Sequence, residues 1–202
     1  MINIHFMTNK NFKRIAELLE ELPQYADDIK DSLQNTILSK HSYLTLPRIL
    51  GVALTAGYAI GNESLLRYIR CDAKKFLTDE EAHASKIAVS TLSMMGTYNY
   101  FNRQKIHKDL VELPSNLSIS NLDNHGIEED VFSMYCLAAA TVNKSLECIE
   151  KYTEKLMHAK VPNTAITMIV EISSVFCAIS AVLEIKRLRS YEFPIQIREE
   201  NI

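Results

Sequence analysis

The sequence predicts an all-α protein, and three observations point to this class. Hydrophobic residues recur at intervals of three and four in segment after segment, as on the buried face of a helix. The chain has only 5 glycines and 5 prolines in 202 residues, few for the tight turns of a sandwich or barrel. With 47% hydrophobic residues, it can bury a sizeable core, and we expect one domain over residues 1–202.

The N-terminal half, expected over residues 7–112, starts with a helical hairpin. Phe12, Ile15 and Leu19 recur at helical spacing before Pro23 ends the first helix, and a second helix follows through Ile37. Pro47 opens a nearly uncharged, apolar segment, residues 49–60, and residues 61–62 are followed by a helix whose apolar face runs from Leu65 to Phe76. Thr78 and Glu81 stand at the spacing of a capping box, which predicts the start of the next helix.

The C-terminal half is expected over residues 127–190, after a linker or functional loop at residues 113–126 that is rich in turn-forming residues. Its predicted helices cover residues 127–142, 143–158 and 164–189. The last is apolar nearly all round, so we expect it in a core or a subunit interface. Shifting the chain by 84 residues places residues 61–65 on residues 145–149, and the order of helices then matches. We therefore predict two related halves.

Composition limits the function classes. The net charge is −3 with both signs mixed, so the chain lacks the basic stripe of a nucleic-acid-binding protein. The longest apolar run, residues 172–183, is about 12 residues, short of the roughly 20 that span a membrane. The N-terminus lacks the features of a signal peptide. We expect no nucleic acid and no membrane as partners, and a cytoplasmic location.

The cysteines predict neither a metal site nor a disulfide framework. Cys71, Cys136, Cys148 and Cys177 lie far apart, without the Cys/His spacing of a zinc site, and we expect no metal and no cofactor. If residues 143–158 are helical, Cys148 falls on the apolar face with Ser145 and Tyr152. A cysteine in this position is either a small core residue or a nucleophile, so both interpretations stay open.

Two stretches carry a resemblance to a known family: residues 22–30 (LPQYADDIK) and residues 95–103 (MGTYNYFNR). With the order of the helices and Asn143, they resemble the AhpD-like alkyl hydroperoxidases of the carboxymuconolactone decarboxylase superfamily. The likeness covers about residues 15–185. It implies an all-α fold with a repeated helical unit and a homo-oligomer built as a trimer or a multiple of trimers.

The resemblance also implies where the active site would be. Peroxidase members carry a Cys-x-x-Cys pair, of which one thiolate attacks the peroxide and the other resolves the sulfenic acid as a disulfide. A Glu and a His transfer the protons. In this chain the corresponding positions are Ser133 for the Glu, Ser145 and Cys148 for the two cysteines, Tyr152 for the His, and Glu147 for a further His between the cysteines.

These replacements predict that the dithiol cycle is lost. A sulfenic acid at Cys148 has no thiol at Ser145 with which to form a disulfide, a carboxylate at Glu147 disfavours a thiolate beside it, and Tyr152 is a poor base at neutral pH. We expect a repurposed binding or structural homo-oligomer, with a small hydroperoxide or an apolar molecule as candidate ligand. The alternative is a weak one-cysteine hydroperoxide reductase that uses Cys148 and an external thiol.

Several further residues have two interpretations each. Cys136 is either a distant resolving thiol or a core residue, and we expect His125 and His158 to be solvated rather than catalytic. Tyr100 belongs to a Met and aromatic stripe that lines either a core or a ligand cavity. A non-redox reaction such as lactone decarboxylation would need a cation, for which Arg103 is the candidate, and stacked helices could also form an interaction module.

Overall fold

The computed structural model describes residues 10–38, 43–104 and 115–189, and every regular element in these ranges is helical. The expected all-α class is confirmed. The eight α-helices of the described ranges are α1 (Lys13–Glu21), α2 (Asp27–Leu33), α3 (Leu46–Ile60), α4 (Glu63–Ala73), α5 (Asp79–Arg103), α7 (Glu129–Val142), α8 (Leu146–His158) and α9 (Asn163–Arg189).

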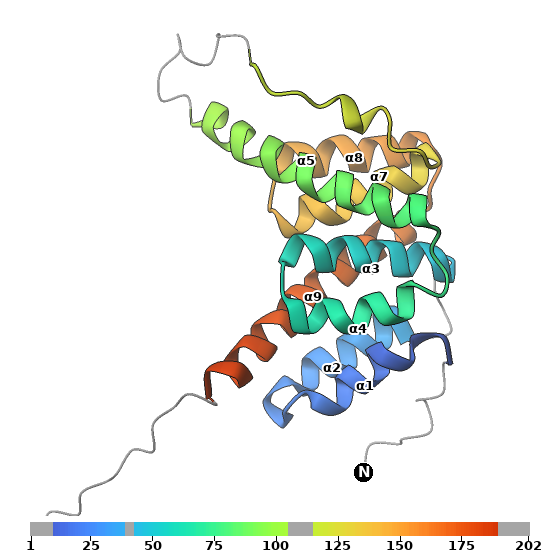
Figure 1. Ribbon diagram of the computed structural model, residues 1–202, viewed down its shortest axis with the longest axis vertical. Helices are drawn as coiled ribbons and strands as arrows, with labels where there is room; N and C mark the ends of the chain where they lie inside the picture. The colour runs from blue at the N-terminus through green and yellow to red at the C-terminus, as the bar shows by residue number, and fades with distance from the viewer. Residues whose placement is uncertain (1–9, 39–42, 105–114, 190–202) are drawn as a thin grey trace, which may run out of the picture.

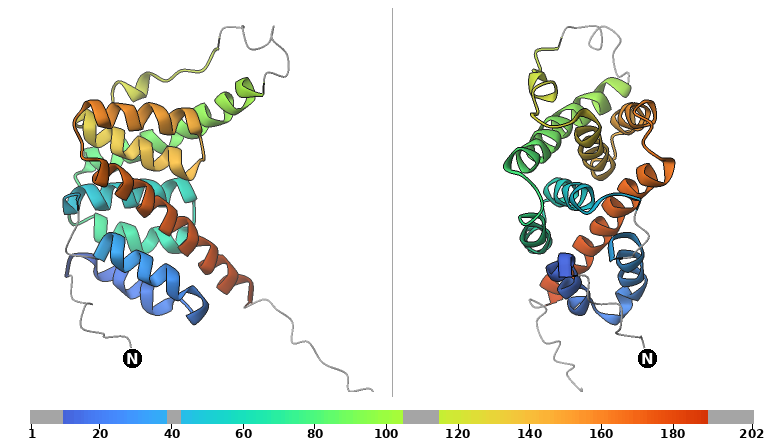
Figure 2. Two further views of the ribbon diagram at one scale, coloured as in Figure 1. Left: turned by 180° about the vertical axis from the view of Figure 1, so that it is seen from behind. Right: turned by 90° about the vertical axis from the view of Figure 1, so that its right-hand side faces the viewer.

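The centre of the molecule is α3 (Figure 1). It packs against α4, α5, α7 and α9, and every residue from Ile49 to Gly57 is buried, which explains why this segment is nearly free of charge. Helices α5, α7 and α8 lie at one end of the molecule, and α1, α2 and α4 lie at the other. Seen from behind in Figure 2, α9 crosses α3 diagonally and connects the two ends.

The helix bounds agree with the predicted relationship between the halves. Adding 84 to the bounds of α3, α4 and α5 gives 130–144, 147–157 and 163–187, against 129–142, 146–158 and 163–189 for α7, α8 and α9. Corresponding helices therefore differ by no more than two residues at either end. The common origin of the halves stays a prediction. Residues 7–9, 39–42, 105–112 and 190 of the predicted halves lie outside the described ranges.

Two predicted helix starts are corrected, and one is confirmed. The capping box at α5 is present, since the Thr78 hydroxyl accepts from the Glu81 amide at 3.1 Å and the Glu81 carboxylate accepts from the Thr78 amide at 2.9 Å. Helix α7 starts at Glu129, two residues later than expected. Helix α8 starts at Leu146 rather than at residue 143, because Lys144 is left-handed (φ 55°) and Ser145 is extended.

Helix α9 is longer than its apolar run of sequence indicates. By length and composition alone its residues 163–188 could cross a membrane, and it is the one described helix of which this is true. Half of its most apolar stretch is buried inside the protein, against α3 and α7 among others. The core helix of a globular protein passes the same test of length and composition, and the absence of a membrane partner stays a prediction.

The predicted linker is described from residue 115 onward, with residues 113–114 outside the described ranges. It contains one 3₁₀ turn, Ser120–Leu122. The expectation that His125 is solvated is wrong: its ring is 8% exposed and stacks on Phe132 with 3.9 Å between ring centroids. Packing against the first turns of α7 buries it, and Glu129 lies 3.1 Å from its Nε2. His158 is exposed, as expected.

Candidate functional site

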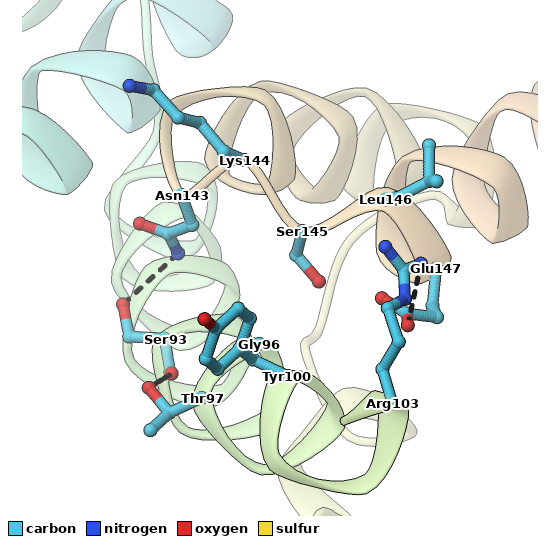
Figure 3. A pocket seen from close by; sticks show the side chains of 10 residues that line it. All are labelled: Ser93, Gly96, Thr97, Tyr100, Arg103, Asn143, Lys144, Ser145, Leu146 and Glu147. Atoms are coloured by element: carbon cyan, nitrogen blue, oxygen red, sulfur yellow. Dashed lines mark hydrogen bonds and ion pairs between the residues drawn. The ribbon is translucent and has the colours of Figure 1, made fainter. Parts of the chain in front are cut away.

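A pocket of about 360 Å³ lies between the C-terminal part of α5 and the start of α8. Figure 3 shows the side chains that line it. Its walls on α5 include Ser93, Thr97, Tyr100 and Arg103, and its walls before and at the start of α8 include Asn143, Ser145 and Glu147. Two of the five positions that the resemblance singled out, Ser145 and Glu147, therefore line this pocket.

Gly96 allows α5 and the start of α8 to approach each other. A β-carbon added at Gly96 would lie 3.3 Å from the Ser145 β-carbon and 3.5 Å from its hydroxyl oxygen. The Asn143 amide donates to the Ser93 hydroxyl at 3.3 Å and connects the same two segments. Small and polar groups thus hold the start of α8 beside α5.

The start of α8 has donors without acceptors. Ser145 is its N-cap residue, but the side chain makes no capping hydrogen bond. Within the described part of the chain, the backbone amides of Leu146, Glu147 and Cys148 have no acceptor, and the Ser145 hydroxyl has no partner although Ser145 is only 6% exposed. The amides of a first helical turn and the helix dipole favour negative charge in front of them.

An ion pair bridges the two walls of the pocket. The Arg103 guanidinium lies 2.8 Å from the Glu147 carboxylate, with side chains 47% and 39% exposed. Because both groups are in contact with water, the pair contributes little to stability, about 1 kcal/mol at most. Its importance is positional, since it holds the charges of both residues at the pocket (Figure 3).

Cys148 lies in the core, beyond the wall of the pocket. It is 1% exposed, which confirms that it looks inward as expected from the helical face. It stands in the first turn of α8, but it is not among the residues that line the pocket. A peroxide could reach its sulfur only after the surrounding helices moved.

Tyr152 of α8 and Cys136 of α7 are buried next to each other where the two helices pack. Burial raises the pKa of the Cys136 thiol to about 12, and the adjacent Tyr152 hydroxyl opposes part of that rise. Burial also raises the pKa of Tyr152 well above its ordinary value, and Cys136 raises it further. Both groups therefore stay protonated at neutral pH, where neither acts as a nucleophile or a base.

Ser133 is separated from the pocket. It lies on α7, is 1% exposed, and its hydroxyl has no partner among the described residues. The structure thus divides the five predicted positions into two at the pocket, Ser145 and Glu147, and three in the core, Ser133, Cys148 and Tyr152.

No family model matches the chain. The alkyl hydroperoxide reductase AhpD of Maricaulis maris (strain MCS10) is 30% identical over 169 residues, which cover 84% of this chain and 96% of the relative. The chain belongs to the AhpD alkyl hydroperoxide reductase family.

Other AhpD reductases agree with this assignment. The protein of Coxiella burnetii (strain RSA 493 / Nine Mile phase I) is 30% identical over 164 residues, 81% of this chain and 93% of the relative. The protein of Acidobacterium capsulatum is 25% identical over 178 residues, 88% of this chain and 97% of the relative. The resemblance inferred from residues 22–30 and 95–103 is therefore confirmed.

The AhpD resemblance did not identify the wall of the pocket on α5. Ser93, Gly96 and Tyr100 follow each other at intervals of three and four residues, so they share one face of the helix, and this shared face was a usable signal. Tyr100 is 67% exposed and lines the pocket, so it does not belong to the core. Arg103, the cation named for a non-redox reaction, lines the pocket as well.

Proposed function

We propose that this AhpD-family protein is a binding or structural protein in which the dithiol hydroperoxidase cycle has been lost. One observation carries the proposal: the start of α8 holds a single thiol, Cys148, which is 1% exposed, and Ser145 stands three residues before it. A hydroxyl cannot resolve a sulfenic acid as a disulfide.

The nearest substitute for a second thiol supports the same proposal. Cys136 lies on α7 and is fully buried, and its pKa of about 12 leaves almost no thiolate at neutral pH. Exchange between a sulfenic acid and a thiol requires access and thiolate character. Cys136 offers neither in the folded protein, so we expect it to be a core residue.

Hydroperoxide consumption tests the proposal. Cumene hydroperoxide is supplied with excess dithiothreitol to the wild type, to Cys148→Ser and to Cys177→Ser, a matched control in which an exposed cysteine is replaced. We expect the three proteins to show the same rate, close to that of the reductant alone. Turnover by the wild type and by Cys177→Ser that disappears in Cys148→Ser would refute the proposal.

A one-cysteine hydroperoxide reductase is the second candidate, and the position of Cys148 favours it. Cys148 stands in the first turn of α8, at the position that corresponds to the second cysteine of the peroxidase motif. Alkylation of the folded protein with iodoacetamide, followed by peptide mass analysis, separates the candidates. Rapid labelling at the exposed Cys71 and Cys177 with protection of Cys148 supports the binding role, and rapid labelling of Cys148 supports the reductase.

We also propose that the protein is a cytoplasmic homo-oligomer, a trimer or a multiple of trimers. The end of α9 supports assembly, because Ile185 and Leu188 are 44% and 58% exposed where the helix extends beyond the bundle (Figure 1). Large apolar side chains in such a position suit a subunit contact. Light scattering after size exclusion is expected to give a mass that is a multiple of three chains, and a monomer would contradict this.

A further inference from the structure

The pocket at the start of α8 has the features of a ligand site, and the first is its set of free donors. Helix α8 has 13 residues, so its dipole is developed, and the amides of Leu146 to Cys148 have no acceptor in the described ranges. Leu146 and Glu147 both line the pocket. Amides at the start of a helix point out along its axis and bind oxyanions.

The second feature is the Ser145 hydroxyl. Ser145 is 94% buried (6% exposed), and its hydroxyl oxygen has no hydrogen-bond partner among the residues that the structure describes. Figure 3 shows the side chain directed into the space between α5 and α8 rather than toward the amides of its own helix. An unpaired buried hydroxyl is destabilising, so its orientation indicates an acceptor from outside the chain.

The third feature is the balance of charge and apolar surface. Arg103 supplies a positive charge at the pocket and Glu147 a negative one, and the two are paired at 2.8 Å. Lys144 also lines the pocket, and its exposed side chain extends away from Ser145 (Figure 3). The helix start therefore contributes the unbalanced positive potential, and the exposed Tyr100 ring offers an apolar surface on the α5 side.

We propose that this pocket binds a small organic carboxylate. The carboxylate accepts from the Ser145 hydroxyl and from the free amides of the first turn of α8, and its apolar body packs on Tyr100. A volume of about 360 Å³ suits a ligand of a few to a dozen heavy atoms. This site specifies the ligand class of the binding role proposed above and rests on that role.

Titration of the ¹⁵N-labelled full chain with sodium benzoate at constant ionic strength tests the site. We expect saturable shifts of the amide signals of Leu146, Glu147 and Cys148, and no such shifts with benzyl alcohol, which has the same body without the charge. Absence of saturable shifts at these amides, or equal shifts with benzyl alcohol, would overturn the proposal.

Two variants and one control sharpen this titration. Ser145→Ala removes one donor to a charged group and is expected to weaken benzoate about tenfold. Glu147→Gln removes the competing carboxylate and frees Arg103, and is expected to tighten benzoate about threefold. Ser90→Ala replaces an exposed serine of α5 that is not among the residues lining the pocket, and it is expected to change nothing. Unchanged affinity in Ser145→Ala and Glu147→Gln would contradict the assignment of these residues.

The two proposals fail in different ways. Hydroperoxide turnover that depends on Cys148 would refute the loss of peroxidase chemistry, whether or not benzoate binds. Silent peroxide assays with no response to benzoate would refute the carboxylate site alone.

Discussion

Helices α4 and α8 occupy corresponding places in the two halves, but the side chains of their N-cap residues make different hydrogen bonds. At α4 the Asn62 side chain accepts from the Leu65 amide at 3.0 Å and donates to Glu184 at 3.1 Å. At α8 the Ser145 side chain does neither and has no partner within the described part of the protein. The first helix start is closed by the protein itself, and the second is open to a pocket.

Under the proposed binding role, the start of α4 serves structure and the start of α8 serves binding. Serine is as good an N-cap residue as asparagine, so the chemistry of Ser145 does not prevent capping. The orientation of the Ser145 side chain into the pocket prevents capping. The open start of α8 is therefore a property of the arrangement of α5 and α8, not of residue type.

The largest expected effect concerns the contact between the halves. Gly51 and Tyr135 are 84 residues apart, in corresponding places on α3 and α7, and a β-carbon added at Gly51 would overlap the Tyr135 hydroxyl. Gly51→Ala is expected to lower the free energy of unfolding by about 2–3 kcal/mol, measured by urea denaturation. Gly57→Ala on the same helix is the control, because its β-carbon meets only the flexible ends of Ile69 and Leu66. Equal losses would contradict this account of the contact.

The next largest effect is expected from replacing the N-cap residues of α4 and α8. Asn62→Ala removes a capping acceptor and is expected to lower the free energy of unfolding by about 1–2 kcal/mol. Ser145→Ala removes no cap and relieves an unpaired hydroxyl, so its expected change is within about 0.5 kcal/mol. Thermal unfolding of both variants measures the difference. A loss at Ser145→Ala as large as that at Asn62→Ala would show that Ser145 caps its helix after all.

The buried Cys136 thiol is expected to lower the stability of the protein at alkaline pH. It corresponds to Val52 of the first half, and both are buried. Because the pKa of Cys136 is about 12 when folded against an ordinary 9.0, the unfolded chain loses the proton first, and stability present below pH 9 is lost as the pH rises toward 12.

The expected loss from this one thiol is about 1 kcal/mol by pH 10. Cys136→Val copies the residue of the first half and is expected to flatten this part of the slope. Unfolding free energies from pH 8 to pH 10 measure it in both proteins. An unchanged slope in the variant would assign the alkaline loss to other groups.

The smallest changes in the free energy of unfolding are expected at the residues that precede the N-caps of α4 and α8. Both are left-handed, Gly61 with φ 74° and Lys144 with φ 55°, and a side chain disfavours this conformation. Lys144→Gly is expected to raise the free energy of unfolding by about 0.5 kcal/mol, and Gly61→Ala to lower it by about 1 kcal/mol. Changes of the same sign would contradict the comparison.

Much of the fold followed from local sequence, whereas the site did not. The capping box at Thr78 and the inward face of Cys148 depend on residues a few positions apart, and both were predictable. The left-handed Lys144 moved the start of α8, and no local pattern distinguishes a lysine in that conformation. The pocket requires Gly96 and Ser145, 49 residues apart, to meet, and the burial of His125 requires α7 to pack over a loop. Such contacts are set by tertiary packing.

The most direct test of the central claim is the mass of the intact protein after one equivalent of cumene hydroperoxide in the absence of reductant. We expect no loss of two hydrogens and no peptide in which Cys148 is joined to Cys136, because these thiols are buried and Cys148 has no thiol beside it at Ser145. Rapid formation of a disulfide between Cys136 and Cys148 would contradict the account, since it would show a dithiol cycle that uses a thiol from α7.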